Sequence, residues 1–360
     1  MFDFCKTSRT AQSFLHFLLL VILALFAGTR VGWSDQDGYM WIFDMVSPLP
    51  VFISGQTFME FRIEYFYLLF NSFLKCFSEN PLVMFLSVAT MVVALNLRAF
   101  RKYSPYFFLS ILVYYSNYYF VGTMTAMRQG LAAAVILTGM AFLADRKWTA
   151  FFITVFVACL FHFSAIFVLF GYLLYRLNFS ARVLFWMVAG SFMMGIFSPI
   201  SHWLFSHFIG LGDLNPQIQT GLNYLEDQQQ GFALGVLRPT SLKQLAICLL
   251  VIRYRDYLCT QLKYFNVLSI FYCAATMWRF IFNDIAVLAA RVGGLLSVGE
   301  PVIVVSFLLL FKPDQRRWIA LLVVVFAAAS LYLNFIAFNF PPYVSALWGG
   351  KYWKEGFFGF

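Results

Sequence analysis

Five ionisable side chains interrupt or border long apolar runs of this chain: Arg128, His162, Arg279, Arg291 and Glu300. An arginine at the centre of a membrane helix costs about 2.5–3.5 kcal/mol on insertion scales, so such groups normally face a bundle interior and serve a function. Arginine binds phosphate through a bidentate fork of donors. Histidine and glutamate transfer protons. These residue types are therefore suited to phosphate binding combined with proton transfer.

Arg128 and His162 have the most informative surroundings. Arg128 begins the run Met127-Arg128-Gln129-Gly130-Leu131-Ala132, at the outer N-terminus of a predicted helix. Free N–H groups at that position favour anions, although an interfacial arginine that reaches for water would look the same. His162 stands between Phe161 and Phe163. It could exchange a proton or hydrogen bond with a sugar or phosphate oxygen, or it could be a core histidine bonded to a backbone carbonyl.

The other three candidates lie further along the chain. Arg279 precedes Asn283-Asp284 at the outer end of a predicted helix, where reaching for water explains it as well as ligand binding does. Arg291 lies deeper and is followed by Gly293-Gly294, which favours a functional role. Glu300 is expected near mid-membrane, directly before a proline, where it is a candidate base. Glu300 lies nine positions after Arg291, whereas neighbours on one helix face are three or four positions apart.

The stretch Gly32-Trp33-Ser34-Asp35-Gln36-Asp37-Gly38-Tyr39 follows the first predicted helix and is the best candidate outside the membrane. A carboxylate there could take a proton from a sugar hydroxyl. Aspartate, glycine and tyrosine are also ordinary turn residues. The spacing does not decide between Asp35 and Asp37.

Composition places all these residues in a membrane protein. Hydrophobic residues make up 62% of the chain and charged residues 11%, against roughly 50% and 25% in soluble domains. The net charge of +9 is spread over short groups between apolar runs, which disfavours nucleic-acid binding. The six cysteines are scattered without a C-x-x-C pair, so no metal site and no cofactor is expected.

The chain therefore predicts an all-α polytopic bundle of about eleven spans, within a single integral membrane domain over 1–360. A span needs about 20 apolar residues. Basic residues gather in the short turns that alternate with the longer loops, which places the N-terminus in the cytoplasm and the C-terminus in the periplasm. The candidate spans are 11–29, 80–97, 104–121, 129–145, 148–162, 163–177, 183–205, 241–254, 264–282, 285–311 and 318–339.

Two regions need special treatment to keep this orientation. Counting 61–78 as a span would move Arg98, Arg101 and Lys102 outside, so an interfacial helix is preferred there. The segment 148–176 has basic residues at both ends and is too short for two full spans. A short hairpin that turns at 161–164 satisfies both constraints, provided that protein or a water-filled cavity covers it.

Two long loops face outward, one over 30–79 with interfacial helices and one over 206–240. The inner side has only short turns. This asymmetry places the function on the outer face, and no internal repeat supports an inverted-repeat transporter.

Three stretches resemble the EpsG-like family of Wzy-type polysaccharide polymerases. Arg30-Val31-Gly32 with Asp35 and Tyr39 is similar to a family stretch, with one extra residue between Gly32 and Asp35. Met127–Ala132 resembles the family's Arg-Gln-x-x-Ala, and Phe161–Ala165 its His-x-Ser-Ala. Arg291 looks like a later family arginine, more loosely. The order of these stretches carries the resemblance, which covers 30–165; beyond it only the apolar pattern agrees.

The resemblance implies a bacterial inner-membrane enzyme with a GT-C-like helical fold and interfacial helices in the first outer loop. It implies that a growing glycan moves from undecaprenyl diphosphate to a hydroxyl of the next lipid-linked repeat unit, on the periplasmic side. The expected partners are this lipid-linked oligosaccharide and membrane lipid, with a chain-length regulator considered as a protein partner.

On this hypothesis the site residues take three roles. Diphosphate binding is assigned to Arg128, Gln129, Arg279 and Arg291; glycan binding to Arg30 and Tyr39; and proton transfer to Asp35, Asp37, His162 or Glu300. A metal is not required if arginines stabilise the leaving group. The alternatives are a flippase or other polysaccharide transporter, an O-antigen ligase, and an acyltransferase, which is disfavoured because no carboxylate lies beside His162 in the sequence.

Overall fold

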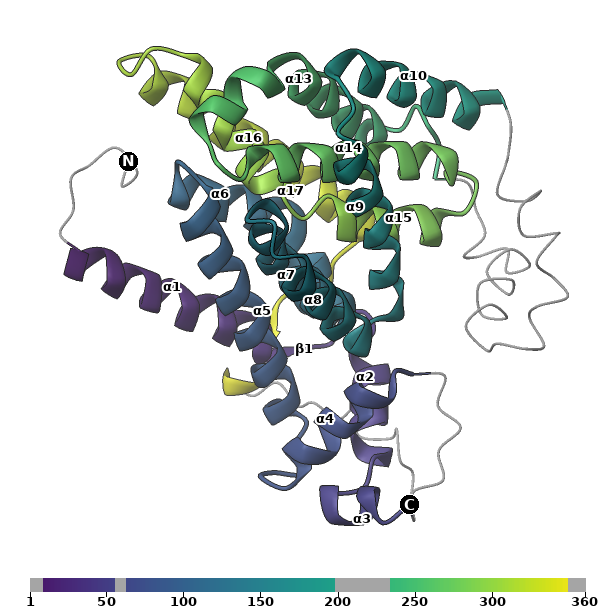
Figure 1. Ribbon diagram of the computed structural model, residues 1–360. Coiled ribbons are helices and arrows are strands. Elements are labelled where there is room, and N and C mark those ends of the chain that lie inside the picture. Colours follow the sequence, from purple (N-terminus) through teal and green to yellow (C-terminus); the bar gives the residue numbers. More distant parts are fainter. Residues whose placement is uncertain (1–8, 56–62, 198–233, 349–360) are drawn as a thin grey trace, which may run out of the picture. The chain divides into compact units, whose positions relative to one another are not determined.

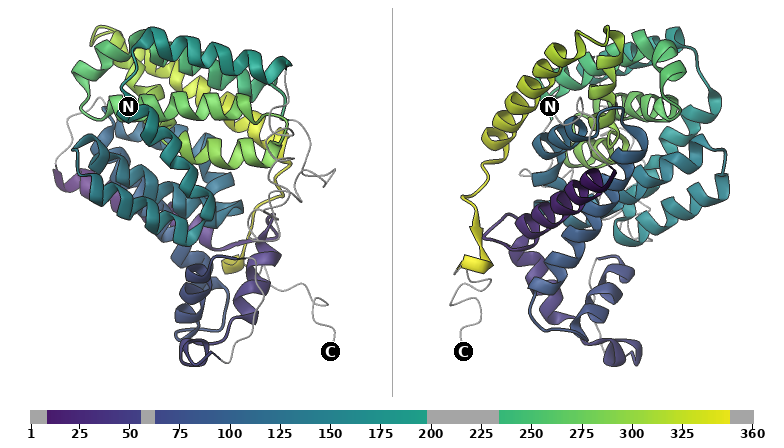
Figure 2. Two further views of the ribbon diagram at one scale, coloured as in Figure 1. Left: turned by 45° about the vertical axis from the view of Figure 1, so that its right-hand side comes forward. Right: turned by 90° about the vertical axis from the view of Figure 1, so that its left-hand side faces the viewer.

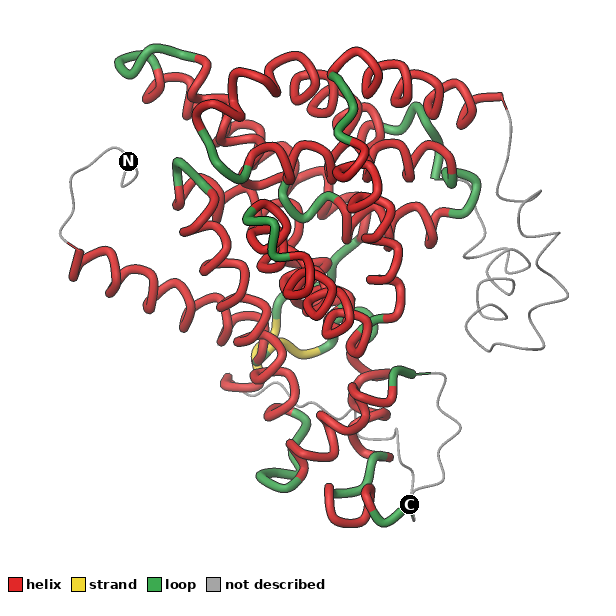
Figure 3. Tube along the Cα trace, in the orientation of Figure 1, coloured by secondary structure: helices red, strands yellow, loops and turns green. Residues whose placement is uncertain are grey.

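A computed structural model describes residues 9–55, 63–197 and 234–348, and Figure 3 shows that this part of the chain is mostly helical. Within these ranges the only sheet is the short pair β1–β2. The prediction of an all-α protein is confirmed. In chain order the elements are α1 (Arg9–Gly28), β1 (Arg30–Val31), α2 (Gln36–Met45), α3 (Leu49–Ile53), α4 (Tyr65–Lys75), α5 (Leu82–Tyr103), α6 (Phe107–Tyr114), the π-helix η2 (Tyr115–Thr125), α7 (Met127–Ala144), α8 (Trp148–Phe161), η3 (Phe163–Phe167), α9 (Val168–Leu177), α10 (Ala181–Phe197), α13 (Pro239–Gln261), α14 (Phe265–Ile281), α15 (Ala286–Leu296), α16 (Glu300–Ser306), η5 (Phe307–Leu310), α17 (Arg316–Phe338), β2 (Val344–Ser345) and η6 (Ala346–Trp348).

Contacts divide the chain into two compact units. The first unit comprises residues 1–138, 160–162 and 311–360, and the second comprises 139–159 and 163–310. Each unit has its own buried apolar core, as expected when helices must pack against one another.

Helices α1 and α5 form the main helix pair of the first unit and run antiparallel. Gly28 near the end of α1 lies against Leu86 near the start of α5, so closely that an added Cβ would come within 2.6 Å of the Leu86 side chain. His16, near the start of α1, packs its ring 4.1 Å from that of Phe107, shortly after α5 ends. The orientation predicted from the basic residues also has these two helices running in opposite directions.

The strand pair joins the end of α1 to the segment that follows α17, which runs down to β2 in Figure 2. Arg30 pairs with Ser345 in antiparallel register. The Thr29 and Ser345 hydroxyls lie 2.9 Å apart, and the Tyr343 ring stacks on Phe26 at 4.1 Å between centroids. Because α1 and α17 end at one place, an orientation with both C-terminal ends on one side of the membrane is geometrically consistent.

The described residues of the predicted first outer loop form three short helices, α2, α3 and α4. Helix α4 has 11 residues, about 16 Å at 1.5 Å per residue, which is too short to cross a bilayer. The Lys75 ammonium at its end donates to the Asp44 carbonyl at the end of α2, at 2.6 Å. Exposed aromatic side chains (Trp41, Tyr65 and Phe73) are typical of helices that lie in a membrane interface. An interfacial position for 61–78 stays a prediction that this length supports.

The second unit is built around α14, which contacts α9, α10, α13 and α15 (Figure 1). All but three of its 17 residues are buried, as expected for a helix that is apolar on every side. The predicted hairpin over 148–176 is confirmed: Phe151 of α8 stacks on Tyr172 of α9 at 5.7 Å, and the Arg176 guanidinium lies 4.9 Å from the Trp148 ring centroid. Helix α15 and the following segment Glu300–Leu310 meet at a bend of 59°.

Within the described ranges, four helices are long and apolar enough to cross a membrane, or five if the bent pair is one span. The four are Thr10–Gly28, Leu82–Tyr103, Met127–Ala144 and Arg316–Phe338. Four shorter apolar helices coincide approximately with the predicted spans 148–162, 163–177, 183–205 and 264–282. The chain is thus a multi-pass membrane protein. The count of eleven spans and their orientation stay predictions, and most of the predicted loop 206–240 lies outside the described residues.

Candidate active site

The first unit brings Arg128 and His162 together on one carboxylate, that of Glu64. The Arg128 Nη1 atom donates to Glu64 Oε2 at 2.5 Å. The Nδ1 atom of His162 lies 3.3 Å from Glu64 Oε1. The Glu64 side chain is only 11% exposed and that of Arg128 24%. Both carboxylate oxygens are therefore engaged, and an arginine and a histidine that are 34 positions apart share one acidic residue.

Arg128 is placed by a close approach of η2 and α7. A Cβ at Gly130 would lie 1.6 Å from the Gly122 carbonyl oxygen, so only glycine fits at this position. The Ala126 N–H donates to Val121 at 2.7 Å in the i to i−5 pattern of a π-helix. Met127, fully buried, then begins α7. The π-helix and the glycine contact thus fix where α7 begins, and with it the position of Arg128.

Glu64 and His162 are placed by aromatic packing between α4 and the end of α8. Glu64 directly precedes α4, as its N-cap residue. The Phe161 ring contacts Phe66 edge to face at 5.2 Å and Phe70 at 6.3 Å. Since Phe66 and Phe70 are one turn apart on α4, they hold Phe161 against one face of that helix. His162 is the next residue and consequently reaches the carboxylate at the helix start.

Two buried tyrosines, Tyr39 and Tyr67, lie next to the Arg128 side chain. The Arg128 guanidinium lies 5.7 Å from the Tyr67 ring centroid, and Tyr67 contacts Tyr39 at 6.3 Å. Burial raises the pKa of both tyrosines, and the Arg128 charge opposes this shift in each. Both phenols therefore keep their protons at neutral pH. Tyr39 was predicted to bind glycan; the structure places it beside Arg128, fully within the protein.

Arg30 is fully buried at the start of β1. Its Nη1 donates to the Ala27 carbonyl at 2.5 Å, and its guanidinium lies 4.9 Å from the Phe85 ring centroid. The Gln36 amide donates to the Arg30 carbonyl at 2.9 Å, and Gly32 between them has φ +77°, a conformation that favours glycine. These contacts shape the turn into α2. Glycan binding by Arg30 stays a prediction.

Asp35 and Asp37 are exposed at the start of α2. Asp35 is the N-cap residue, has φ 62° and makes no side-chain capping bond. The structure gives neither aspartate a contact with the pair of Arg128 and His162. Gln129 follows Arg128 in α7 and is half-buried.

The remaining predicted residues belong to the second unit. Glu300 begins α16 at the bend and is 3% exposed; its Oε1 accepts from the Lys243 ammonium at 3.0 Å and its Oε2 from the Tyr272 hydroxyl at 2.8 Å. Arg279 donates to the Ser241 hydroxyl at 3.1 Å. Arg291 is half-buried in α15. The structure therefore assigns the predicted residues to two groups, one in each unit.

Sequence reasoning missed Glu64 as a site residue. It is one of several charges in the loop 30–79 and precedes His162 by 98 positions, so no spacing joins the two. The only local signal is its position directly before the aromatic run of α4. One prediction has to be corrected. No carboxylate lies beside His162 in the sequence, but Glu64 contacts it in the structure, so this ground for disfavouring an acyltransferase does not hold.

No three histidine, cysteine, aspartate or glutamate side chains gather in a metal-binding arrangement within residues 9–55, 63–197 and 234–348. The ionisable groups that meet at Glu64 are instead a guanidinium, an imidazole and a carboxylate. Such a set can bind an anion and accept a proton.

Comparison with known proteins covers nearly the whole chain. A sequence model of the EpsG family matches residues 13–345, a range that includes Glu64, Arg128 and His162. No curated protein and no solved structure gives a significant match.

Proposed function

The chain belongs to the EpsG family, and on that premise we propose that it is a polysaccharide polymerase of the bacterial inner membrane. In this proposal it transfers a growing glycan from undecaprenyl diphosphate to a hydroxyl of the next lipid-linked repeat unit, on the periplasmic side. The observation that carries the proposal is the joint attachment of Arg128 and His162 to Glu64. A guanidinium, which can bind an anion, and an imidazole, which can accept a proton, contact the same carboxylate.

Arg128 is assigned to the diphosphate. As the glycosyl–phosphate bond breaks, negative charge develops on the leaving oxygen. A guanidinium donates two parallel hydrogen bonds to such a group, and its charge is effective because the side chain is largely withdrawn from water. Gln129 in the same helix turn is a second proposed donor. Arg279 and Arg291 in the second unit keep their proposed role in diphosphate binding.

His162 is assigned to the acceptor hydroxyl. The imidazole that donates from Nδ1 to Glu64 carries its lone pair on Nε2. In the proposed step the hydroxyl oxygen forms a bond to the anomeric carbon, whose bond to the diphosphate oxygen breaks. The hydroxyl proton moves to His162, and undecaprenyl diphosphate leaves with the bonding electron pair. No oxidant or reductant is needed.

His162 becomes the favoured base among the four predicted ones for a geometric reason. It shares a carboxylate with the phosphate-binding Arg128. Glu300 is engaged by Lys243 and Tyr272, and Asp35 and Asp37 are exposed. These three acids keep only the weaker proposed role of contacting substrate, together with Arg30 and Tyr39.

An acyltransferase is the second candidate, because the pair of Glu64 and His162 also fits a histidine that activates a hydroxyl for acylation. A ligase would use the same donor with a different acceptor. A flippase would need no proton acceptor beside the diphosphate site. These functions leave different products on the cell surface.

The test is deletion of the gene followed by complementation, with the surface polysaccharide separated on a gel. A polymerase predicts that the ladder collapses to a single repeat unit, and that Arg128→Ala and His162→Gln fail to restore it. The matched control is Arg253→Ala, which removes an exposed arginine on α13 and should restore the ladder fully. Loss of the single-unit band would indicate export or ligation, and a normal ladder with altered acyl content an acyltransferase; either result overturns the proposal.

A further inference from the structure

Binding of a diphosphate at Arg128 would change how Arg128 and His162 share the Glu64 carboxylate. One carboxylate oxygen accepts a hydrogen bond from Arg128, and the other lies within hydrogen-bond distance of the His162 Nδ1 atom. A diphosphate would compete with that carboxylate for the Arg128 donors, because both are anions. Within the described part of the chain the Nε–H of Arg128 is buried and has no acceptor, so its side chain offers an unused donor next to the one that Glu64 occupies.

We propose that Glu64 couples binding of the lipid diphosphate at Arg128 to the basicity of His162. The coupling rests on the proposed function, since it concerns the same site. When phosphate oxygens take the Arg128 fork, Nη1 moves from Glu64 to the phosphate. The carboxylate then keeps its contact with the His162 imidazole and loses the Arg128 charge. Glu64 is a positioning residue in this scheme, acting through Arg128 and His162.

The direction of the effect follows from the charges around His162. Glu64 approaches it from the start of α4, and Arg128 from the start of α7 on the far side of the same carboxylate. Tyr39 from α2 and Tyr67 from α4 lie beneath Arg128 and keep their protons. With Arg128 paired to Glu64, its positive charge offsets the carboxylate. With Arg128 on the diphosphate, the carboxylate stabilises the imidazolium more strongly, because an opposite charge within hydrogen-bond distance favours the charged form.

The consequence is a base that becomes strong only when the donor is in place. An imidazole of higher pKa accepts the hydroxyl proton more readily. In the empty site, where Arg128 is paired with Glu64, His162 is a weaker base. The pair also explains why a carboxylate, which repels a diphosphate, stands at a diphosphate site.

Proton uptake on binding tests the coupling without requiring turnover. Undecaprenyl diphosphate is titrated by calorimetry into the purified full-length protein near pH 6.5, in buffers of different ionisation enthalpy. A rise in the His162 pKa predicts net proton uptake by the wild type. His162→Gln and Glu64→Gln should show less uptake, with Glu64→Gln binding equally or more tightly. Equal uptake in all three proteins would overturn the coupling.

Turnover gives a second readout. Glu64→Gln is expected to lower kcat for the lipid-linked repeat unit about 10–100-fold, within the range of a general base. The donor KM should stay the same or fall, and the acid limb of the kcat profile should move to lower pH. Glu79→Gln, at an exposed site of the same loop, should match the wild type. A higher KM with an unchanged pH profile would mean that Glu64 merely orients Arg128. If the wild type takes up protons but makes no polymer, the proposed function fails and the coupling stands.

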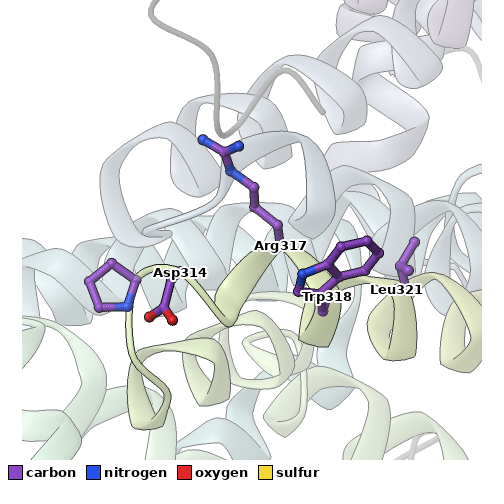
Figure 4. A pocket seen from close by; sticks show the side chains of 5 residues that line it. Asp314, Arg317, Trp318 and Leu321 are labelled. Carbon is purple, nitrogen blue, oxygen red and sulfur yellow. The ribbon is translucent and has the colours of Figure 1, made fainter.

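An independent observation concerns the turn before α17. Figure 4 shows a surface pocket lined by Pro313, Asp314, Arg317, Trp318 and Leu321. The Arg317 guanidinium points away from Asp314 in this view. Trp318 is 74% exposed and Leu321 54%. The charge pattern assigns this turn to the cytoplasmic side.

We infer that this pocket takes the headgroup of an anionic phospholipid. Lys312, Arg316 and Arg317 outnumber Asp314 in this turn, so the turn is net positive. Tryptophan is a residue preferred at headgroup depth, and basic groups at the cytoplasmic surface attract anionic lipid. The exposed apolar side chains of Leu321, Leu322 and Val325 continue from the pocket along α17, where acyl chains would lie.

Native mass spectrometry of the purified protein tests this site with phosphatidylglycerol, phosphatidylcholine and inorganic phosphate as probes. Phosphatidylglycerol should be retained and should raise the melting temperature more than the other two. Arg317→Gln should lose at least half of this retention, while Arg98→Gln, at the exposed cytoplasmic end of α5, should keep it. Equal retention of phosphatidylcholine, or no effect of Arg317→Gln, would overturn the inference. Equal stabilisation by inorganic phosphate would identify an ion site and overturn the lipid assignment.

Discussion

Replacing Gly130 by alanine should damage both stability and activity, because this glycine sets the distance between η2 and α7. An added Cβ would lie 1.6 Å from the Gly122 oxygen and 2.4 Å from its carbonyl carbon. Contacts under 3.0 Å are essentially never seen for a Cβ, so the helices must separate by at least 3.0 − 1.6 = 1.4 Å. Overpacking of this kind typically costs 1–3 kcal/mol, and a backbone oxygen gives way less easily than a side chain.

The same shift should move Arg128, two residues before Gly130. A misplacement of about 1 Å in a catalytic group can cost about 10²-fold in rate, so Gly130→Ala should lose activity of this order in whatever fraction still folds. Thermal unfolding in detergent and polymer formation in liposomes measure the two effects. The control is Gly38→Ala in α2, where no atom lies within 4 Å of the added Cβ; its stability should stay the same or rise by about 0.5–1 kcal/mol. Wild-type stability and activity of Gly130→Ala would show that the contact between Gly130 and Gly122 does not position Arg128.

Arg128→Lys keeps the charge but loses the planar fork, so kcat/KM should fall about 10–100-fold, whereas Arg253→Lys should have no effect; equal activity of both variants would contradict the phosphate assignment. Burial raises the Tyr67 pKa, so the folded state keeps a proton that the unfolded state loses above about pH 10. The free energy of unfolding should therefore fall as pH rises beyond 10. Between pH 9 and 11 it should fall less steeply with pH in Tyr67→Phe than in the wild type, and equal slopes would contradict a raised Tyr67 pKa. Lys243→Met removes the ammonium 3.0 Å from the buried Glu300 and should lower the free energy of unfolding by about 2–4 kcal/mol. Combining it with Glu300→Gln should recover part of that loss, as measured by denaturant unfolding. If the losses of the two single variants simply add, the two side chains do not interact.

The helices could be predicted from the sequence because they follow apolar runs. The bounds of α1, α5, α7 and α17 lie within a few residues of predicted spans, with α5 extending further at its end. The hairpin over 148–176 followed from two physical constraints, basic ends and a length too short for two spans. The turn at His162 could therefore be placed before any contact was known.

The partners of the site residues could not be predicted, because they depend on tertiary packing. Glu64 reaches Arg128 and His162 only because Phe161 packs on α4, and no periodicity encodes that contact. Glu300 pairs with Lys243 of α13, a residue to which no motif points. The π-helix η2 was expected only as the end of an ordinary span, since its i to i−5 bonds have no simple sequence signature.

Arg128 and His162 themselves were found from their surroundings, by a different kind of signal. Each is an ionisable group beside apolar residues, where it costs free energy unless it has a partner or a function. The sequence could show that a partner was needed, and the structure shows Glu64 to be that partner.

The most direct test of the account supplies the purified protein in liposomes with one chemically defined undecaprenyl-diphosphate-linked repeat unit. Mass spectrometry then follows both the glycans and the carrier. A polymerase should give carrier-linked dimers and longer products, with one undecaprenyl diphosphate released for each new glycosidic bond. His162→Gln and Arg128→Ala should give no such products. Intact starting material, or release of the carrier with hydrolysed single units and no new bond, would contradict it.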